Sequence, residues 1–176
     1  MCYDFFMSDG KRHNVDYLII GGGIAGTTAA EAIRGKDDRG TIAILNKEPY
    51  ELYSRVLLPK YVEGALSRSQ VFLRKTEDYN RQNISLYLDD EATVVDIKRN
   101  EVRTRRGMVF FYKELLITAG GHVKPWRVKG AEDVPVMRFH TINDAEKLYD
   151  KLSERRGQDA VIIGGGFITL ELMNAL

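Results

Sequence analysis

The sequence predicts an α/β protein: a parallel βαβ unit, an antiparallel β-meander after it, and the start of a second βαβ unit near the end of the 176 residues. Three observations lead to this fold class. A short apolar run ends in a glycine cluster and continues into a helix-like segment, and the same pattern returns about 140 residues later. Between the two copies, the chain changes to short apolar runs of the kind found in strands.

The first βαβ unit is predicted over residues 15–46. Residues 16–20 are expected to form a strand that ends at three glycines, and the alanine-rich segment 24–34 has helical composition. Residues 41–45 are apolar and rich in β-branched side chains, which predicts a buried second strand parallel to the first. Residues 1–14 are expected to be a mobile tail.

The rest of the chain divides into a meander, a linker and the start of a second βαβ unit. Alternating runs over residues 83–118 predict the antiparallel meander. Residues 122–140 resemble a linker, and Thr141 with Asp144 resembles a capping box that opens an amphipathic helix. From Ala160 onward, a strand, a glycine turn and a helix are expected again.

Composition limits the classes of function. An apolar fraction of 44% is ordinary for a packed core. The 26 Lys and Arg balance 25 Asp and Glu, so the net charge of +1 gives no reason to expect nucleic acid as a partner. No apolar run approaches the roughly 20 residues of a membrane span, no secretion signal is recognisable, and the single cysteine, Cys2, cannot form an internal disulfide. We therefore expect a cytoplasmic protein whose partners are small molecules or proteins.

The first glycine cluster fits the pattern G-x-G-x-x-G through Gly21, Gly23 and Gly26. Between a strand and a helix, this pattern is typical of dinucleotide binding. Gly21 would permit the sharp turn, Gly23 the approach of a pyrophosphate, and Gly26 the close packing of helix on strand. The amides of the first helical turn, at Ile24 and Ala25, would hold the phosphates. The alternative is a glycine-rich turn that binds nothing.

The second strand ends at Asn46, Lys47 and Glu48. An acid near this position usually binds the ribose hydroxyls of adenosine. Asn46 can hydrogen-bond a hydroxyl without charge assistance, Glu48 would supply an acid two residues later, and Lys47 would favour a phosphate. A solvated loop without ligand contacts is the alternative for all three.

The second glycine turn keeps Gly164 and Gly166 but has Thr169 in place of the third glycine. A β-branched side chain at that position should push the helix away from the strand. We expect this turn, with Phe167 and Ile168 in its first helical turn, to bind a nucleotide more weakly than the first turn, or not at all.

These features together resemble the pyridine nucleotide-disulfide oxidoreductases, flavoproteins with two dinucleotide sites, over residues 15–176. The resemblance implies FAD on the first glycine turn and NAD(P)H on the second. It implies a Rossmann-like FAD-binding domain over 15–121, the linker 122–140, and the start of a Rossmann-like NAD(P)-binding domain over 141–176. Because the family's later segments are missing, the expectation is an N-terminal fragment that binds FAD weakly.

Two segments carry the residues for which the resemblance implies a part in catalysis. Residues 53–60 (YSRVLLPK) are similar to the family's Y-x-R-x-x-L-S-K, which implies that Arg55 and Lys60 are FAD ligands, with Lys60 near the flavin. Residues 164–171 (GGGFITLE) are similar to GGGxIGxE, whose glutamate, here Glu171, faces the nicotinamide.

Two further segments imply FAD contacts. Residues 91–96 are similar to the strand whose valine, here Val94, touches the adenine through its main chain. Residues 116–121 (LITAGG) are similar to L-I-A-T-G-[GAS], with Ala and Thr in reversed order. This segment closes over FAD in the family, which implies contacts from Ala119 and Gly120.

The absence of cysteine between Asn46 and Lys60 points to the thiol-free branch of this family. That branch includes ferredoxin and rubredoxin reductases and the NAD(P)H-oxidising part of nitrite reductase. The implied reaction is hydride transfer from NAD(P)H to FAD, with the electrons passed to an external acceptor such as an iron–sulfur or haem protein or domain. The rival hypothesis is a non-catalytic FAD- or nucleotide-binding or redox-sensing module with a degraded NAD site, for which Thr169 is the evidence.

Other chemically capable residues are assigned no site. His13, His122 and His140 lack metal-ligand spacing and are expected at the surface or in linkers. The acidic run 89–91 is expected to be a solvated turn, and the basic run 103–106 a guarded sheet edge. We expect no metal site.

Overall fold

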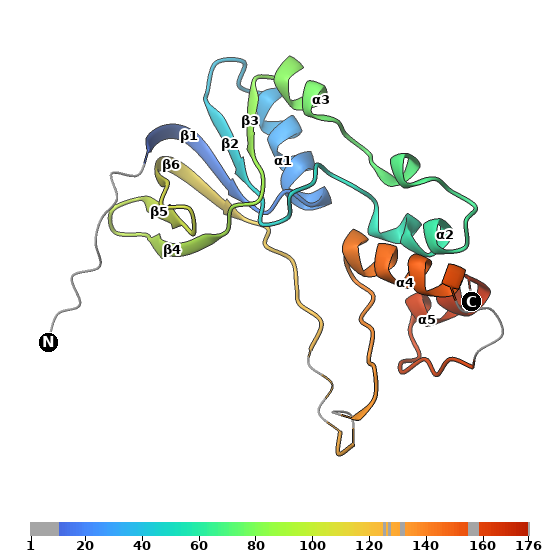
Figure 1. Cartoon of the computed structure of the whole chain (residues 1–176). Coiled ribbons are helices and arrows are strands. Elements are labelled where there is room, and N and C mark those ends of the chain that lie inside the picture. Colours follow the sequence, from blue (N-terminus) through green and yellow to red (C-terminus); the bar gives the residue numbers. More distant parts are fainter. Residues whose placement is uncertain (1–10, 125, 127, 131–132, 155–158, 176) are drawn as a thin grey trace, which may run out of the picture. The chain divides into compact units, whose positions relative to one another are not determined.

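The computed structural model describes residues 11–124, 126, 128–130, 133–154 and 159–175. The chain forms two compact units (Figure 1). The first comprises Met1–Tyr53 and Arg74–Gly120, and the second Ser54–Leu73 and Gly121–Leu176. Among the described residues, no helix is both long and apolar enough to cross a bilayer.

The first unit is built on a six-stranded sheet with the order β3-β2-β1-β6-β5-β4 (Figure 1). β1 pairs in parallel with β2 and β6, and β2 with β3, whereas β4, β5 and β6 are antiparallel. β6 therefore belongs to both the parallel sheet and the meander. The meander was predicted to begin at residue 83, which is wrong for residues 84–87, because they form β3 and pair in parallel with β2. The strands are β1 (Arg12–Ile20), β2 (Ile42–Leu45), β3 (Ile84–Tyr87), β4 (Ala92–Asp96), β5 (Glu101–Thr104) and β6 (Val109–Ile117).

The carboxyl ends of four strands meet at one edge of this sheet. Ile20 at the end of β1 is paired with Leu45 of β2 and with Ile117 of β6, and Leu45 is paired with Tyr87 of β3. In open α/β sheets this edge is where ligands bind.

Both faces of the parallel sheet are covered. Leu18 and Ile19, neighbours in β1, are each 0% exposed and belong to different apolar clusters. Burial on both faces explains why β2 has the continuous apolar sequence IAIL. Ile19 packs with side chains of α1 (Ile24–Arg34) and α3 (Thr76–Arg81), and Leu18 with the meander. The cluster on the helical face contains Ile19, Ala30, Ile42, Ile44, Tyr79 and Ile84, and the cluster on the meander face Leu18, Ala43, Leu45, Val102, Phe110 and Tyr112.

The second unit is helical among its described residues. α2 (Leu58–Val62) packs against α4 (Ile142–Glu154) and α5 (Phe167–Ala175), and two 3-10 turns, Arg55–Leu57 and Arg68–Val71, flank α2. The capping box at the start of α4 is confirmed. The Thr141 amide donates to Asp144 Oδ2 at 2.9 Å, and the Asp144 amide to Thr141 Oγ1 at 3.2 Å.

Two further predicted elements differ from the structure. β1 begins at Arg12, so residues 12–14 are in the sheet rather than in a tail, because the nine-residue β6 supplies pairing partners for them. Residues 159–165 contain no strand before the second glycine turn, since no described strand pairs with them. The part of the tail that includes Cys2, residues 1–10, lies outside the described residues.

Candidate functional site

The first glycine turn lies at the carboxyl end of β1. Gly21 has φ +111°, and a Cβ added there would lie 2.3 Å from the Thr118 carbonyl oxygen. A Cβ at Gly26 would lie 1.9 Å from the Gly21 carbonyl oxygen. Both positions therefore require glycine for the fold itself. A Cβ at Gly23 would meet nothing within 4 Å, so the fold itself does not require glycine at this position.

The turn presents backbone donors that the protein itself does not use. The amides of five consecutive residues have no acceptor among the described residues, and the first turn of α1 contains no acidic side chain. Unpaired amides and the positive end of a helix dipole together favour an anion. These amides belong to Gly22, Gly23, Ile24, Ala25 and Gly26.

The segment after β6 runs beside the glycine turn. The Thr118 amide donates to the Ile20 carbonyl at 2.7 Å, which continues the parallel pairing of β6 with β1. Ala119 and Gly120 follow and are exposed, and Gly120 has φ +68° with open space around it. The structure thus brings these two predicted contact residues to the same edge as Gly21.

Asn46 stands directly against the glycine turn. A Cβ at Gly22 would lie 2.8 Å from Asn46 Cγ. The Asn46 amide donates to the Tyr87 carbonyl at 2.8 Å, and its side-chain Nδ2 donates to the Tyr50 carbonyl at 2.8 Å. Its side-chain Oδ1 keeps its acceptor capacity, with no donor among the described residues.

The other two candidates at this strand end have charged or hydroxyl partners. Lys47 Nζ lies 3.2 Å from Glu91 Oε1, and this hydrogen bond lowers the pKa of the Glu91 carboxyl. Glu48 Oε2 accepts a hydrogen bond from the Tyr53 hydroxyl at 2.6 Å. Of Asn46, Lys47 and Glu48, Asn46 is therefore the residue that lies against the glycine turn and has a side-chain oxygen with no donor among the described residues.

The start of β4 is tied to the end of β2. The Asp89 amide donates to the Glu48 carbonyl and the Asp90 amide to the Asn46 carbonyl, each at 3.1 Å. Val94 follows in β4 and is 51% exposed. Val94, the predicted adenine contact, thus lies on β4. The loop that leads into β4 bonds to the main chain of Asn46 and Glu48, the predicted ribose contacts.

The acidic and basic runs differ from expectation. Asp90 is only 2% exposed rather than solvated, and its Oδ1 accepts the Arg106 amide at 3.0 Å. Glu91 pairs with Arg105 and Asp89 with Arg106. β5 lies between β4 and β6 and is not a sheet edge. The two runs occupy facing turns of the meander, and opposite charge brings them together.

His13 was expected at the surface or in a linker, and this was also wrong. Its ring stacks on Phe110 at a centroid distance of 4.7 Å, and its Nδ1 lies 3.2 Å from the Tyr87 hydroxyl. Extension of β1 to Arg12 places His13 inside the sheet. His122 is exposed and His140 half-buried. Within the described part of the chain, no three His, Cys, Asp or Glu side chains form a group that could hold a metal ion.

The second unit holds the two residues predicted to act in catalysis. Lys60 Nζ lies 2.9 Å from Glu63 Oε2, and this hydrogen bond is the main cause that raises the pKa of Lys60. The charge of Glu171 raises it further, so Lys60 and Glu171 interact electrostatically between α2 and α5. Arg55 Nη1 donates to the His140 carbonyl at 3.1 Å.

The second glycine turn is more open than the first. Gly164 has φ +140°, and a Cβ there would lie 3.2 Å from Thr169 Oγ1, whereas a Cβ at Gly166 would meet nothing within 4 Å. The Thr169 amide donates to the Gly166 carbonyl at 3.0 Å. Phe167 is 88% and Ile168 56% exposed. Thr169 was expected to push the helix away from a preceding strand, but residues 159–165 form no strand, and Thr169 Oγ1 faces Gly164 instead.

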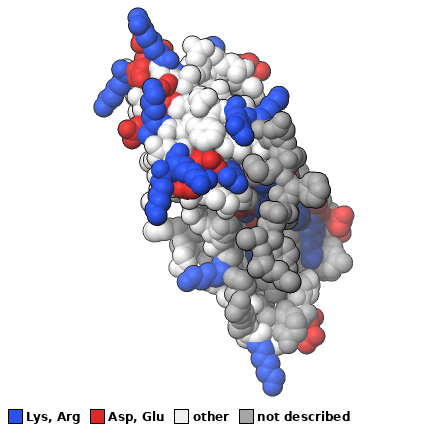
Figure 2. Space-filling view, turned by 90° about the vertical axis from the view of Figure 1, so that its left-hand side faces the viewer, with Lys and Arg blue, Asp and Glu red and all other residues white. Residues whose placement is uncertain are grey.

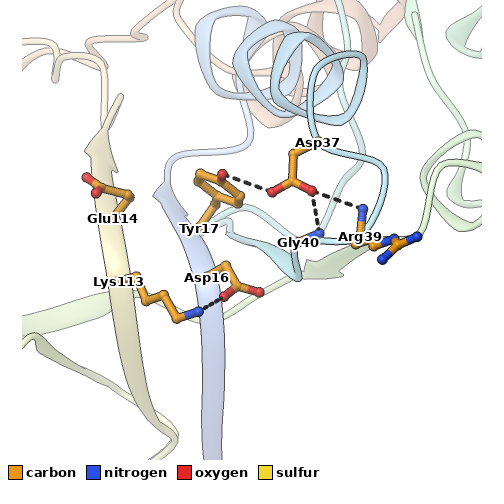
Figure 3. Close-up of a pocket in the computed structure, with 7 residues that line it drawn as sticks. All are labelled: Asp16, Tyr17, Asp37, Arg39, Gly40, Lys113 and Glu114. Atoms are coloured by element: carbon orange, nitrogen blue, oxygen red, sulfur yellow. Dashed lines mark hydrogen bonds and ion pairs between the residues drawn. The ribbon is translucent and has the colours of Figure 1, made fainter.

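A pocket of about 410 Å³ lies beside the middle of β1 and β6 and the segment that leads into β2, and no residue of the glycine turn lines it (Figure 3). Its polar groups bond mainly to each other. The Tyr17 hydroxyl donates to Asp37 at 3.0 Å, and Lys113 lies 2.6 Å from Asp16. These bonds help to lower the pKa of both carboxyls and raise that of Lys113. The lining residues are Asp16, Tyr17, Asp37, Arg39, Gly40, Lys113 and Glu114.

Basic and acidic side chains are interspersed on the face shown in Figure 2. No extended patch of one sign is visible there, in agreement with the net charge of +1.

Comparison with known proteins decides the family. The model of the pyridine nucleotide-disulphide oxidoreductases matches residues 15–176. The chain belongs to this family. A rubredoxin-NAD(+) reductase from Pseudomonas putida is 30% identical over 159 residues, which are 90% of this chain and 40% of that protein. A peroxisomal monodehydroascorbate reductase 1 from Arabidopsis thaliana is 32% identical over 91% of this chain and 40% of its own length.

Solved structures show the same Rossmann-like fold in this family. NADH:rubredoxin oxidoreductase from Clostridium acetobutylicum has a TM-score of 0.81 at 29% identity, over 92% of this chain and 41% of that one. The reductase complexed with putidaredoxin has a TM-score of 0.79 at 26% identity, over 93% of this chain and 40% of that one. The chain thus spans about 40% of the length of the curated relatives it matches.

Sequence reasoning assigned no role to two threonines that contact the glycine turn. Thr118 Oγ1 shares its one proton between the Ile20 and Gly21 carbonyls, and Thr27 Oγ1 donates to the Gly22 carbonyl. The reversed order of Thr118 and Ala119 was the available signal for the first. Nothing in the local pattern around Thr27 marked the second.

Proposed function

We propose that the first unit is the FAD-binding part of an NAD(P)H oxidoreductase. The observation that carries this proposal is the row of five amides without acceptors at a glycine turn whose Gly23 faces open space. When bound, FAD would accept a hydride from NAD(P)H and release electrons to an acceptor outside the chain. Relatives named for rubredoxin, and a structure with putidaredoxin, support an external redox protein or domain as acceptor.

Within the first unit, each group has a distinct task. The amides at Ile24 and Ala25 bind the FAD pyrophosphate, where the helix dipole favours negative charge. Asn46 accepts a hydrogen bond from an adenosine ribose hydroxyl through Oδ1. The main chain of Val94 contacts the adenine, and Ala119 with Gly120 borders the cofactor. Lys47 and Glu48 hold the surrounding loops through Glu91 and Tyr53.

Within the second unit, Arg55 and Lys60 provide positive charge for FAD, and Glu171 lies on the nicotinamide side. The elevated pKa of Lys60 keeps its ammonium charged near neutral pH, which suits a group that faces a reduced, anionic flavin. NAD(P)H binds at the turn of Gly164 and Gly166, with Phe167 and Ile168 in the first turn of α5. We also propose a cytoplasmic location, which fractionation of cells would test.

A non-catalytic FAD- or nucleotide-binding or redox-sensing module is the second candidate. The open second turn, with Thr169 and no strand before it, favours this candidate. In both cases the chain binds FAD, and the two differ in whether NAD(P)H reduces it.

The test is anaerobic mixing of the flavin-loaded complete gene product with NADH and, separately, NADPH. Bleaching of the flavin absorbance within seconds by either nucleotide supports the oxidoreductase. Flavin that is bound but not bleached by either supports the non-catalytic module. A protein that takes up no FAD contradicts both.

A further inference from the structure

Three consecutive carbonyls of the first glycine turn are held by threonine hydroxyls. Thr118 Oγ1 lies 3.0 Å from the Ile20 carbonyl oxygen and 3.1 Å from that of Gly21. Thr27 Oγ1 lies 3.3 Å from the Gly22 carbonyl oxygen. The two threonines come from the end of β6 and from α1, so they approach the turn from different elements.

A fixed carbonyl also fixes an amide. In a planar trans peptide, the carbonyl of one residue and the N–H of the next point in opposite directions. The bond from Thr118 to the Gly21 carbonyl therefore directs the Gly22 N–H away from Thr118, and the bond from Thr27 to the Gly22 carbonyl does the same for Gly23. These two amides are among those without an acceptor in the described structure.

We propose that Thr27 and Thr118 are positioning residues for the dinucleotide pyrophosphate. They set the orientation of the Gly22 and Gly23 peptides before the ligand arrives, so that binding does not have to order a turn of flexible glycines. This inference rests on the proposed function, because it needs the pyrophosphate group as the anion that the amides receive.

Thr27 is itself oriented by a buried chain of hydrogen bonds. Its Oγ1 lies 3.2 Å from the Tyr79 hydroxyl, and the two residues are 1% and 2% exposed. Because a carbonyl oxygen can only accept, the single Thr27 hydroxyl proton goes to the Gly22 carbonyl, and Thr27 Oγ1 then accepts the proton of the Tyr79 hydroxyl.

Tyr79 has a proton to donate at neutral pH. Loss of solvent raises the pKa of its hydroxyl, which therefore stays protonated. With its acceptor site occupied by Tyr79, the Thr27 hydroxyl has its own proton available for the Gly22 carbonyl.

The test compares hydroxyl-free and hydroxyl-retaining variants of the complete gene product. Thr118→Val and Thr27→Val should each weaken FAD binding about 10-fold in a flavin fluorescence titration, whereas Thr118→Ser and Thr27→Ser should stay within about 3-fold of wild type. Tyr79→Phe, which leaves Thr27 in place but removes its donor, should weaken binding about 3-fold. Thr76→Val, which removes a hydroxyl bonded to Glu51 instead, is the matched control and should bind FAD as wild type does.

A second readout separates positioning from stability. In ¹⁵N-labelled protein titrated with inorganic pyrophosphate, the Gly22 and Gly23 amide resonances should shift in wild type and in the serine variants, and much less in the valine variants. If a valine variant does not fold, the Tyr79→Phe protein provides the same comparison.

The outcomes distinguish the two proposals. Valine variants that bind FAD and pyrophosphate as wild type does would overturn the positioning role and leave the FAD assignment standing. Serine variants as weak as the valine variants would also overturn it, because the methyl group rather than the hydroxyl would then be responsible. A wild-type protein that binds neither ligand would overturn the FAD assignment, and the positioning role with it.

Discussion

The two glycine turns of this chain share a sequence pattern and differ in structure. In the first, added Cβ atoms would come within 2.3 Å of backbone at Gly21 and 1.9 Å at Gly26. In the second, the nearest atom to a Cβ at Gly164 is a side-chain hydroxyl 3.2 Å away, and Gly166 has open space. The first turn is closely packed on its surroundings, and the second is not.

The difference comes from the neighbours of each turn rather than from the glycines. β1 has a parallel strand on both sides, and Thr27 and Thr118 hold the carbonyls that follow it. Residues 160–163 pair with no described strand, and the described residues give the second turn no comparable hydroxyl contacts to its carbonyls. A glycine pattern therefore becomes a preorganised anion site only where flanking strands and side chains fix its peptides.

The largest expected loss of stability comes from adding a methyl group at Gly26 in the first turn. Gly26→Ala would place Cβ 1.9 Å from a backbone oxygen that cannot move without breaking the turn. We expect a loss of about 3 kcal/mol in the free energy of unfolding, with FAD binding abolished. In the second turn Thr169 already occupies the position of the third glycine, so the comparison there is Gly166→Ala, whose Cβ would meet nothing within 4 Å and whose effect on unfolding should stay below about 0.5 kcal/mol. Denaturant melts of the two variants measure both values, and equal losses would contradict the comparison.

Gly23→Ala separates ligand binding from folding within the first turn. The added Cβ meets no protein atom within 4 Å, so the melting temperature without ligand should be almost unchanged. The methyl group would occupy the space for the pyrophosphate, and we expect FAD to bind at least about 10-fold more weakly. Isothermal titration with FAD provides the affinity. Unchanged affinity would show that the ligand does not approach at Gly23.

Thr169→Gly tests whether the second turn can be made more like the first. Removal of the side chain that faces Gly164 should let the helix approach the turn and tighten NAD(P)H binding by about 3-fold in the complete gene product. Glycine inside α5 should also cost about 1 kcal/mol of helix stability. Nucleotide titration and a thermal melt measure the two effects. Affinity that stays the same or falls would show that Thr169 is not what weakens this turn.

The first turn also shows how far sequence reasoning reached. The βαβ unit, the meander and the need for glycine at Gly21 and Gly26 followed from local patterns, because strand, turn and helix signals lie within a few residues of one another. The bond from Thr118 to the Gly21 carbonyl joins residues 97 apart in sequence, and no local pattern encodes it. The burial of Asp90 likewise depends on the facing turn of the meander, which supplies the Arg106 amide.

Asp16, in the middle of β1, gives the smallest expected effect and provides a control for the glycine turn. Asp16 accepts hydrogen bonds from Lys113 and from the amide and hydroxyl of Thr41, which hold its pKa far below the usual value. A depressed carboxyl pKa stabilises the fold at pH values above the unfolded pKa of about 4, and this contribution is lost as the pH falls through the folded value. Asp16→Asn should therefore lower the melting temperature slightly at pH 7, and the gap to wild type should narrow as the pH falls below about 4. Because the hydrogen-bond partners of Asp16 lie outside the glycine turn, FAD affinity at pH 7 should not change. A clear loss of FAD affinity would show that the middle of β1 is coupled to the turn.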